Sequence, residues 1–436
     1  MTTAIGVPET ADARAMRRRG LTLGLLTLTY FFSYMDRQIL AILLELIKAD
    51  LKLTDTQLGL LSGLAFAIFY ATLGVPVARL ADRSNRRNII AVALALWSAM
   101  TALCGLAQNF AQLLLARIGV GVGEAGSSPP SHSIIADLYP PEKRAGAMAI
   151  YSTGVVLGGG FGTMIGGYVA SLYGWRWAMV VVGVPGVLLA IFVRALVVEP
   201  RRGLSDPARA PDGTPMPSVG SAFAAMWRNG PAFHLVMAVT ITSMIGYALA
   251  GWGPSYLQRS LGYTVREVAL LFAPLAAVAG TIGGVAGGVI ANRAASRYGL
   301  HIQSWMVAAL KLLALPFMLG FYLTDDRTVA IVCYILNYLF ASSYLGPTFA
   351  LIQGLAPLRM RAMWAAVTLL VINLVGLGLG PTLIGILSDL LRPLAGEASL
   401  RWALVCVGAA TPWAIWHYWR AGVLLKRKAE AAAMPA

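Results

Sequence analysis

Long apolar runs separated by short polar stretches dominate the pattern along this chain of 436 residues. Twelve of these runs reach roughly the 20 residues that a helix needs to cross a lipid bilayer. Within them apolar and polar residues do not alternate, so the pattern predicts helices rather than the strands of a barrel. The predicted spans are 21–46, 57–80, 88–107, 110–137, 145–172, 177–198, 231–257, 264–291, 302–323, 327–352, 362–387 and 400–422. The expected fold class is an all-α membrane protein with twelve transmembrane helices.

The composition agrees with this prediction. Hydrophobic residues make up 58% of the chain and charged residues only 12%, whereas soluble globular proteins carry about 25% charged residues. A chain of this kind cannot cover itself with a polar surface, which excludes a soluble protein. The three cysteines lie in separate apolar segments without the spacing of a metal site, so we expect them to be small core residues. We predict no metal and no cofactor.

Basic residues are concentrated in alternate loops. By the positive-inside rule these loops face the cytoplasm, which places both termini there. The net charge of +15 is then explained by topology and calls for no nucleic-acid partner. We find no small-residue cleavage site of a signal peptide before the first span and expect a multi-pass protein of the cell (inner) membrane. The loops that carry this bias contain Arg83, Arg86, Arg87, Lys143, Arg144, Arg293, Arg297, Arg359 and Arg361.

The longest interruption, residues 198–231, divides the spans into six and six. Its first part is rich in Pro, Gly and Ser and is typical of a linker. Its second part predicts a short amphipathic helix capped by Ser218, with Val219, Phe223, Met226 and Trp227 on one face. The expected organisation is a cytoplasmic tail (1–20), a six-helix bundle (21–198), a cytoplasmic linker with a short helix (199–230), a second six-helix bundle (231–422) and a cytoplasmic tail (423–436).

The two predicted bundles resemble each other weakly. "LADR" at 80–83 returns as "IANR" at 290–293, and "RWAM" at 176–179 returns as "RWAL" at 401–404. Between these, "LYPPEKRA" at 138–145 corresponds to "LAPLRMRA" at 355–362. Matches in the same order indicate a duplicated six-helix unit, and two such units around a central cavity are a transporter architecture.

The loop after the second span carries a family resemblance. "ARLADRSNRRN" at 78–88 is similar to the G-x-L-A-D-R-x-G-R-R motif of the major facilitator superfamily, with Ala78 and Asn85 in place of glycines. The resemblance covers essentially the whole chain and implies two pseudo-symmetric six-helix halves. "GGGFGTMIGG" at 158–167 resembles the fifth-helix motif of antiporters and exporters, with Thr163 in place of proline. The alternative for these glycines is a small-residue face that lets helices pack closely.

A narrower resemblance is to the Spinster lipid transporters. It rests on "YMDRQILA" (34–41), "ARIGVGVGEA" (116–125), "IIADLYPPEKR" (134–144) and "GWGPSYL" (251–257). This resemblance implies a carrier for lysophospholipids or sphingoid phosphates that works by alternating access and is linked to protons.

Four ionisable residues lie deep within predicted spans: Asp36 and Arg37 in the first, and Arg117 and Glu124 in the fourth. Charges at this depth are costly and usually face a cavity or a partner. Asp36 and Arg37 point about 100° apart on a helix and need outside partners, for which we expect Arg117 and Glu124 respectively. In the superfamily both helices line the cavity.

This set is neutral as a whole and can exchange partners. We expect Asp36 and Glu124 to couple transport to protons, and Arg37 and Arg117, once released from their acids, to bind an anionic head group. The alternative is a static network that holds the helices together.

Other candidates are less specific. By family likeness, Asp82, Arg83, Arg86 and Asp137 form a cytoplasmic latch in which Asp82 meets a helix N-terminus and an arginine reaches Asp137; a solvated charge run is the alternative. Tyr247, Trp252, Tyr344 and Asn373 are plausible substrate-binding residues, although aromatic residues in membrane helices often only pack. His132 is expected to be structural, and Lys311 either to extend toward the membrane surface or to contact a lipid phosphate.

Apart from Lys311, the second half buries almost no charge in its predicted spans, which suits an amphiphile with its head on the first half and its tail on the second. No P-loop, zinc-protease or nucleophile-elbow motif occurs, so we exclude an enzyme. The prediction is a proton-linked secondary transporter of an anionic, lipid-like substrate; the alternative is a proton-coupled symporter of small organic anions. Expected partners are the substrate, protons and membrane lipids, and we expect a monomer.

Overall fold

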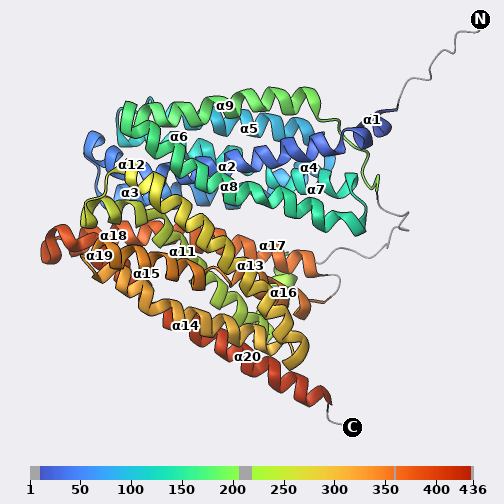
Figure 1. The fold of residues 1–436 in the computed structure, drawn as a ribbon. Helices are drawn as coiled ribbons and strands as arrows, with labels where there is room; N and C mark the ends of the chain where they lie inside the picture. The colour runs from blue at the N-terminus through green and yellow to red at the C-terminus, as the bar shows by residue number, and fades with distance from the viewer. Residues whose placement is uncertain (1–9, 206–218, 358–359, 434–436) are drawn as a thin grey trace, which may run out of the picture. The chain divides into compact units, whose positions relative to one another are not determined.

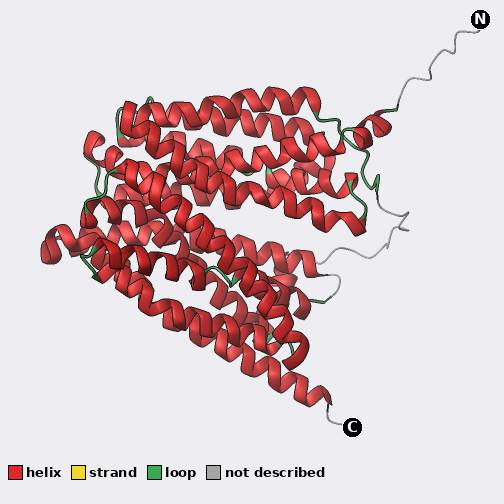
Figure 2. Ribbon diagram, in the orientation of Figure 1, coloured by secondary structure: helices red, strands yellow, loops and turns green. Residues whose placement is uncertain are grey.

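The structure is a computed structural model that describes residues 10–205, 219–357 and 360–433 (Figure 1). Helices account for almost all of this part of the chain, and no strand occurs in it (Figure 2). Nine helical stretches among the described residues are long and apolar enough to cross a membrane, and one of them, Met363–Ala431, covers two predicted spans. The predicted all-helical architecture is confirmed.

Each predicted span corresponds to one helix or to a helix with a break. The first six are α2 (Arg19–Leu51), α3 with α4 (Asp55–Ser62 and Leu64–Arg83), α5 (Arg86–Cys104), α6 with α7 (Phe110–Glu124 and Ser128–Leu138), α8 (Pro141–Tyr173) and α9 (Trp175–Leu196). A short helix, α1 (Ala11–Arg17), precedes them.

The second six spans follow the linker helix α10 (Val219–Arg228). They are α11 (Gly230–Leu261), α12 with η1 and α13 (Val265–Glu267, Val268–Phe272 and Ala273–Tyr298), α14 (His301–Leu323), α15 with α16 (Arg327–Ala341 and Leu345–Leu355), α17 with η3 and α18 (Arg361–Val371, Ile372–Leu379 and Gly380–Ala395), and α19 with α20 (Ser399–Gly408 and Thr411–Ala433). A 3-10 turn, η4 (Gly396–Ala398), precedes α19.

The chain forms two compact units. Unit 1 comprises Met1–Leu43 and Ile68–Gly213, and unit 2 comprises Leu44–Ala67 and Thr214–Ala436. The hairpin of residues 44–67, which joins the first two spans, therefore packs with unit 2, although the sequence assigns it to the first six-helix bundle. The six-plus-six domain boundaries stay a prediction.

In unit 1, the glycine-rich motif of α8 brings this helix against α2. A Cβ atom on Gly158 would lie 2.2 Å from the carbonyl oxygen of Phe31, and one on Gly162 would lie 2.7 Å from that of Met35. Any side chain at these positions would push the helices apart. Close packing therefore accounts for these two glycines without any reference to export.

In unit 2, α10 packs on the core only in part. Ala222 and Met226 are buried in a cluster with Trp364 of α17 and Tyr418 of α20. Phe223 and Trp227 remain exposed. Only part of the predicted apolar face of α10 is therefore buried against the core. The predicted cap Ser218 lies outside the described residues.

Candidate functional site

The central feature of unit 1 is an ion pair between the first and fourth spans. α6 ends at Glu124, just before the pair Pro129–Pro130 that interrupts the span. The Nη2 and Nε atoms of Arg37 donate to Oε2 of Glu124 at 2.7 and 2.8 Å, and Ser33 donates to the same oxygen at 2.7 Å. The other oxygen, Oε1, is buried and accepts no hydrogen bond from the described residues. The predicted pairing of Arg37 with Glu124 is present.

Two tyrosines that the sequence analysis missed complete the surroundings of Arg37. Its guanidinium lies 4.9 Å from the ring centroid of Tyr34 and 4.6 Å from that of Tyr70. Such contacts stabilise a cation that has been removed from water. Tyr34 precedes Arg37 by three positions on α2 and so shares its face, a spacing that could have identified it.

Asp36 has a different environment. Its side chain is completely buried, as are those of Trp97, Thr101 and Arg117. Neither carboxylate oxygen makes a hydrogen bond of ordinary geometry with any residue in the described part of the chain. The charge of Arg117 acts on Asp36, but the pairing predicted for these two residues stays a prediction, and the carboxyl group is incompletely satisfied. A buried acid in this condition is suited to hold a proton.

At the predicted cytoplasmic end of unit 1, Arg86 forms a second buried cluster. It pairs with Asp137, donates to Oε1 of Glu199 at 2.7 Å and donates to the carbonyl oxygen of Pro200 at 2.8 Å. Asp137 also accepts the backbone N–H of Gly203 at 2.8 Å. The expected contact between an arginine and Asp137 is present, and it fixes the segment after α9, which the sequence analysis did not foresee.

Asp82 and Arg83, the other two predicted latch residues, lie at the end of α4 and are exposed. Neither joins the contacts of Arg86 in the described part of unit 1.

Loss of the Arg86 cluster is expected to release the segment after α9. Asp137→Asn, and more strongly Arg86→Ala, should speed the reaction of a cysteine placed at the buried Val197 with a membrane-impermeant maleimide by about tenfold, because each removes charge-assisted hydrogen bonds. Arg83→Ala, at an exposed neighbouring position, is the matched control. Wild-type labelling rates in both cluster variants would contradict a latch.

The candidate residues in unit 2 have different surroundings. Trp252 has no exposed surface and donates its indole N–H to the carbonyl oxygen of Pro381 at 2.8 Å, so it is not available to a substrate in this conformation. Tyr247 is partly buried against the core. Asn373 is half-buried in the π-helical stretch η3, a kind of irregularity that is frequent at functional sites.

Lys311 and Tyr344 meet at the break between α15 and α16. The Nζ atom of Lys311 donates to the carbonyl oxygen of Ala341 at 2.9 Å and lies 4.4 Å from the ring centroid of Tyr344. The Tyr344 hydroxyl lies 3.4 Å from that of Ser243 on α11. Lys311 does not extend toward the membrane surface, because it is buried and caps the end of α15. Its contact with a lipid phosphate stays a prediction. His132 is exposed and packs edge-on against Tyr151.

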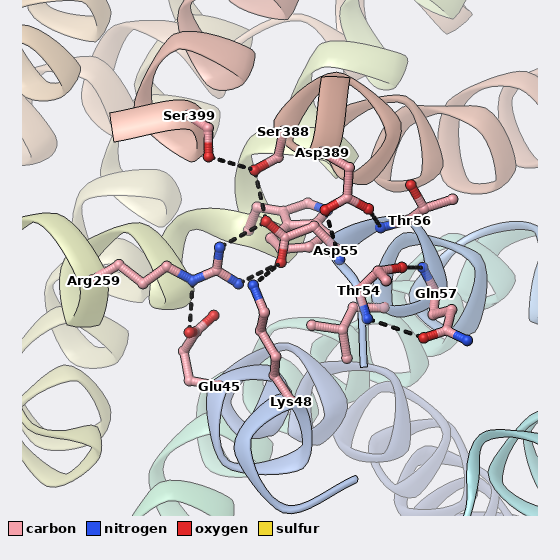
Figure 3. Close-up of polar contacts among 12 residues, drawn as sticks. Glu45, Lys48, Thr54, Asp55, Thr56, Gln57, Arg259, Ser388, Asp389 and Ser399 are labelled. Atoms are coloured by element: carbon pink, nitrogen blue, oxygen red, sulfur yellow. Dashed lines mark hydrogen bonds and ion pairs between the residues drawn. The ribbon is translucent and has the colours of Figure 1, made fainter. Parts of the chain in front are cut away.

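Unit 2 also contains a charged cluster that the sequence analysis missed (Figure 3). Arg259, at the end of α11, donates to Glu45 at 2.6 Å and to both carboxylate oxygens of Asp55 at 2.7 Å. Lys48 and Ser388 also donate to Asp55, each at 2.6 Å. Lys48 and Arg259 lie in the last turns of α2 and α11, and both are bound to acids.

The chain is similar to several known proteins. Residues 26–381 match the model of the Major Facilitator Superfamily. An MFS-type efflux pump of Mycolicibacterium smegmatis is 35% identical, over 92% of this chain and 91% of that protein. A probable sulfoacetate transporter, SauU of Cupriavidus necator, is 28% identical, over 74% of this chain and 77% of that protein. A crystal structure of a bacterial homologue of the human lysosomal transporter Spinster, inward-facing and unoccupied, matches with a TM-score of 0.84 and 30% identity, over 94% of this chain and 98% of that one.

Proposed function

The chain belongs to the Major Facilitator Superfamily and is a multi-pass membrane transporter rather than an enzyme, and we propose that it carries an anionic, lipid-like amphiphile by alternating access coupled to protons. The family match confirms the predicted fold class of twelve helices in two pseudo-symmetric halves. We further propose that the protein acts as a monomer in the inner membrane with both termini in the cytoplasm.

The observation that carries the proposal is the pair of Arg37 and Glu124. Both N–H groups of Arg37 that reach Glu124 bind one oxygen, Oε2. A phosphate or carboxylate of a substrate is also an anion, and it can bind the guanidinium with two oxygen atoms instead of one. When the anion takes the place of Glu124, this carboxylate is left buried without its cation and takes up a proton. Substrate and proton then bind together.

Asp36 and Arg117 extend the same chemistry. Asp36 is already short of hydrogen bonds, so it is a second place at which a proton can be held. If Arg117 turns from Asp36 to the substrate, it adds a second guanidinium to the head group. We assign Asp36 and Glu124 to proton coupling and Arg37 and Arg117 to substrate binding.

The lipid-like part of the substrate is supported by likeness and by composition. The crystal structure of the bacterial Spinster homologue covers nearly the whole chain, and the candidate residues Tyr247, Tyr344 and Asn373 of unit 2 are neutral and partly buried. These residues suit the tail or linker of an amphiphile.

A symporter of small organic anions is the second candidate. It is favoured by the relative that is described as a probable sulfoacetate transporter, and an arginine–glutamate pair would bind a small sulfonate or carboxylate equally well. The two candidates differ in whether an acyl chain contributes to binding, since each buried CH₂ group adds about 0.8 kcal/mol.

Uptake of a labelled lysophospholipid into proteoliposomes tests the proposal. We expect unlabelled lysophospholipids to compete, and sulfoacetate and other small organic anions at the same concentration to have no effect. Empty liposomes and Arg37→Ala protein are the controls. Competition by the small anions alone, or no uptake above that of empty liposomes, would contradict the lipid-like substrate.

A further inference from the structure

The N-terminus of α3 is held by an aspartate from a distant part of the chain. Asp389 of α18 accepts the backbone N–H of Thr56 at 2.7 Å and that of Asp55 at 3.2 Å. Thr54 and Gln57 form a capping box at the same helix end. The first N–H groups of a helix have no partner within the helix, and the helix dipole favours a negative charge there. Asp389 thus completes the cap of α3 across 333 positions of sequence.

Glycines bring the backbones of α3 and α18 into direct contact. A Cβ atom on Gly59 would lie 2.8 Å from the carbonyl oxygen of Pro381, and one on Gly385 would lie 2.2 Å from that of Asp55. Neither position accepts a side chain unless the helices move apart. The two helices therefore meet along the short helix α3, at a distance that only glycine permits.

Charge pairs hold the same end of the hairpin of residues 44–67. Arg259 joins Glu45 on α2 to Asp55 on α3, and the Asp55 side chain is only 3% exposed. Lys48 adds a second cation to Asp55. Charge-assisted hydrogen bonds between poorly solvated groups are stronger than surface ion pairs, so these contacts bind the hairpin firmly to α11 and α18 (Figure 3).

We propose that Glu45, Lys48, Asp55, Arg259 and Asp389, here called the outer latch, keep the end of the transporter opposite the cytoplasm closed. The hairpin belongs by sequence to the first six-helix half, whereas Arg259 and Asp389 belong to the second. Any movement that separates these halves at this end must break the contacts of Arg259 and withdraw Asp389 from the N-terminus of α3. Residues 44–67 are therefore the gate element. Arg259 is its central residue, because it binds both Glu45 on α2 and Asp55 on α3.

The inference rests on the proposed function only in requiring two alternating states, and its test needs no substrate. In this test a cysteine replaces Leu53, a buried residue next to the outer latch. A membrane-impermeant maleimide is then added from the outer side, and the labelling rate is measured. Asp389→Asn keeps the shape of the side chain and removes its charge, and Arg259→Gln removes the central cation. We expect both substitutions to raise the labelling rate about tenfold, because each removes a charged hydrogen bond that keeps the hairpin in place. Arg392→Gln, at an exposed position of α18, is the matched control.

Asp389→Asn leaves the ion pairs of Arg259 in place and therefore tests the cap of α3 separately from them. Size-exclusion profiles identify variants that fold. An unchanged labelling rate in folded Asp389→Asn and Arg259→Gln protein would overturn the proposal. Fast labelling that occurs only in variants without the native size-exclusion profile would also overturn it. A failure of lysophospholipid uptake in the earlier assay would leave this result unaffected.

Discussion

Replacing Glu124 with glutamine is expected to abolish the pH dependence of transport. Glu124 is the acid that Arg37 contacts with two N–H groups, and its free oxygen is buried. If Glu124 takes up the proton when the substrate displaces it, glutamine, which has no exchangeable charge, cannot transfer that proton. Initial rates of lysophospholipid uptake at pH 5.5 to 8.5, values chosen to bracket neutrality, should vary about tenfold or more in the wild type and stay nearly flat in Glu124→Gln.

Ser33→Ala is the control for this experiment. It removes a hydrogen bond to the same Glu124 oxygen but changes no charge, and should lower the rate modestly, by about five- to tenfold, with the pH profile retained. The proton role of Glu124 would be wrong if Glu124→Gln and wild-type protein showed the same pH profile.

Replacing Arg37 with lysine is expected to weaken substrate binding although the charge is kept. The guanidinium offers several N–H groups in one plane, whereas an ammonium acts as a point charge. Lysine also loses the flat stacking surface between Tyr34 and Tyr70. Loss of one two-point contact at a poorly solvated site costs about 1.5–3 kcal/mol, roughly ten- to a hundredfold in affinity. Arg117→Lys should behave in the same way.

Isothermal titration with a lysophospholipid that bears a phosphate monoester, and with its neutral monoacylglycerol analogue, separates the head group from the tail. We expect the lysine variants to lose affinity for the first and to bind the second as the wild type does. Arg83→Lys, at the exposed end of α4, is the matched control. Unchanged affinity for the phosphate-bearing lipid in both variants would show that these arginines only balance Asp36 and Glu124.

The sequence predicted the pairs that lie on regular helices at large depth. Arg117 and Glu124 are seven positions apart, so they share a face, and isolated charges in apolar spans must find each other. This reasoning led to the pair of Arg37 and Glu124. The pair of Arg86 and Asp137 was predicted from the family likeness. The contact of Arg86 with Glu199 could not be predicted, because no local sequence pattern fixes the course of the chain after α9.

The outer latch could not be predicted from the sequence. Its members look like ordinary loop charges, and the contacts depend on the packing of α3 against α18, which joins residues 333 positions apart. Trp252 shows the reverse error. Its aromatic character suggested a cavity residue, but the indole N–H needs a partner when buried, and it finds the carbonyl oxygen of Pro381 inside the core.

The exchange of partners at Arg37 is tested most directly by counting protons when substrate binds. Purified protein in weakly buffered detergent solution, with a pH indicator, is mixed with a saturating lysophospholipid. We expect net uptake of about one proton per wild-type molecule, because the anion leaves the buried Glu124 carboxylate without Arg37, and no uptake in Glu124→Gln. Lipid binding to the wild type without proton uptake, or with the same uptake in Glu124→Gln, would contradict the coupling of substrate and proton at this pair.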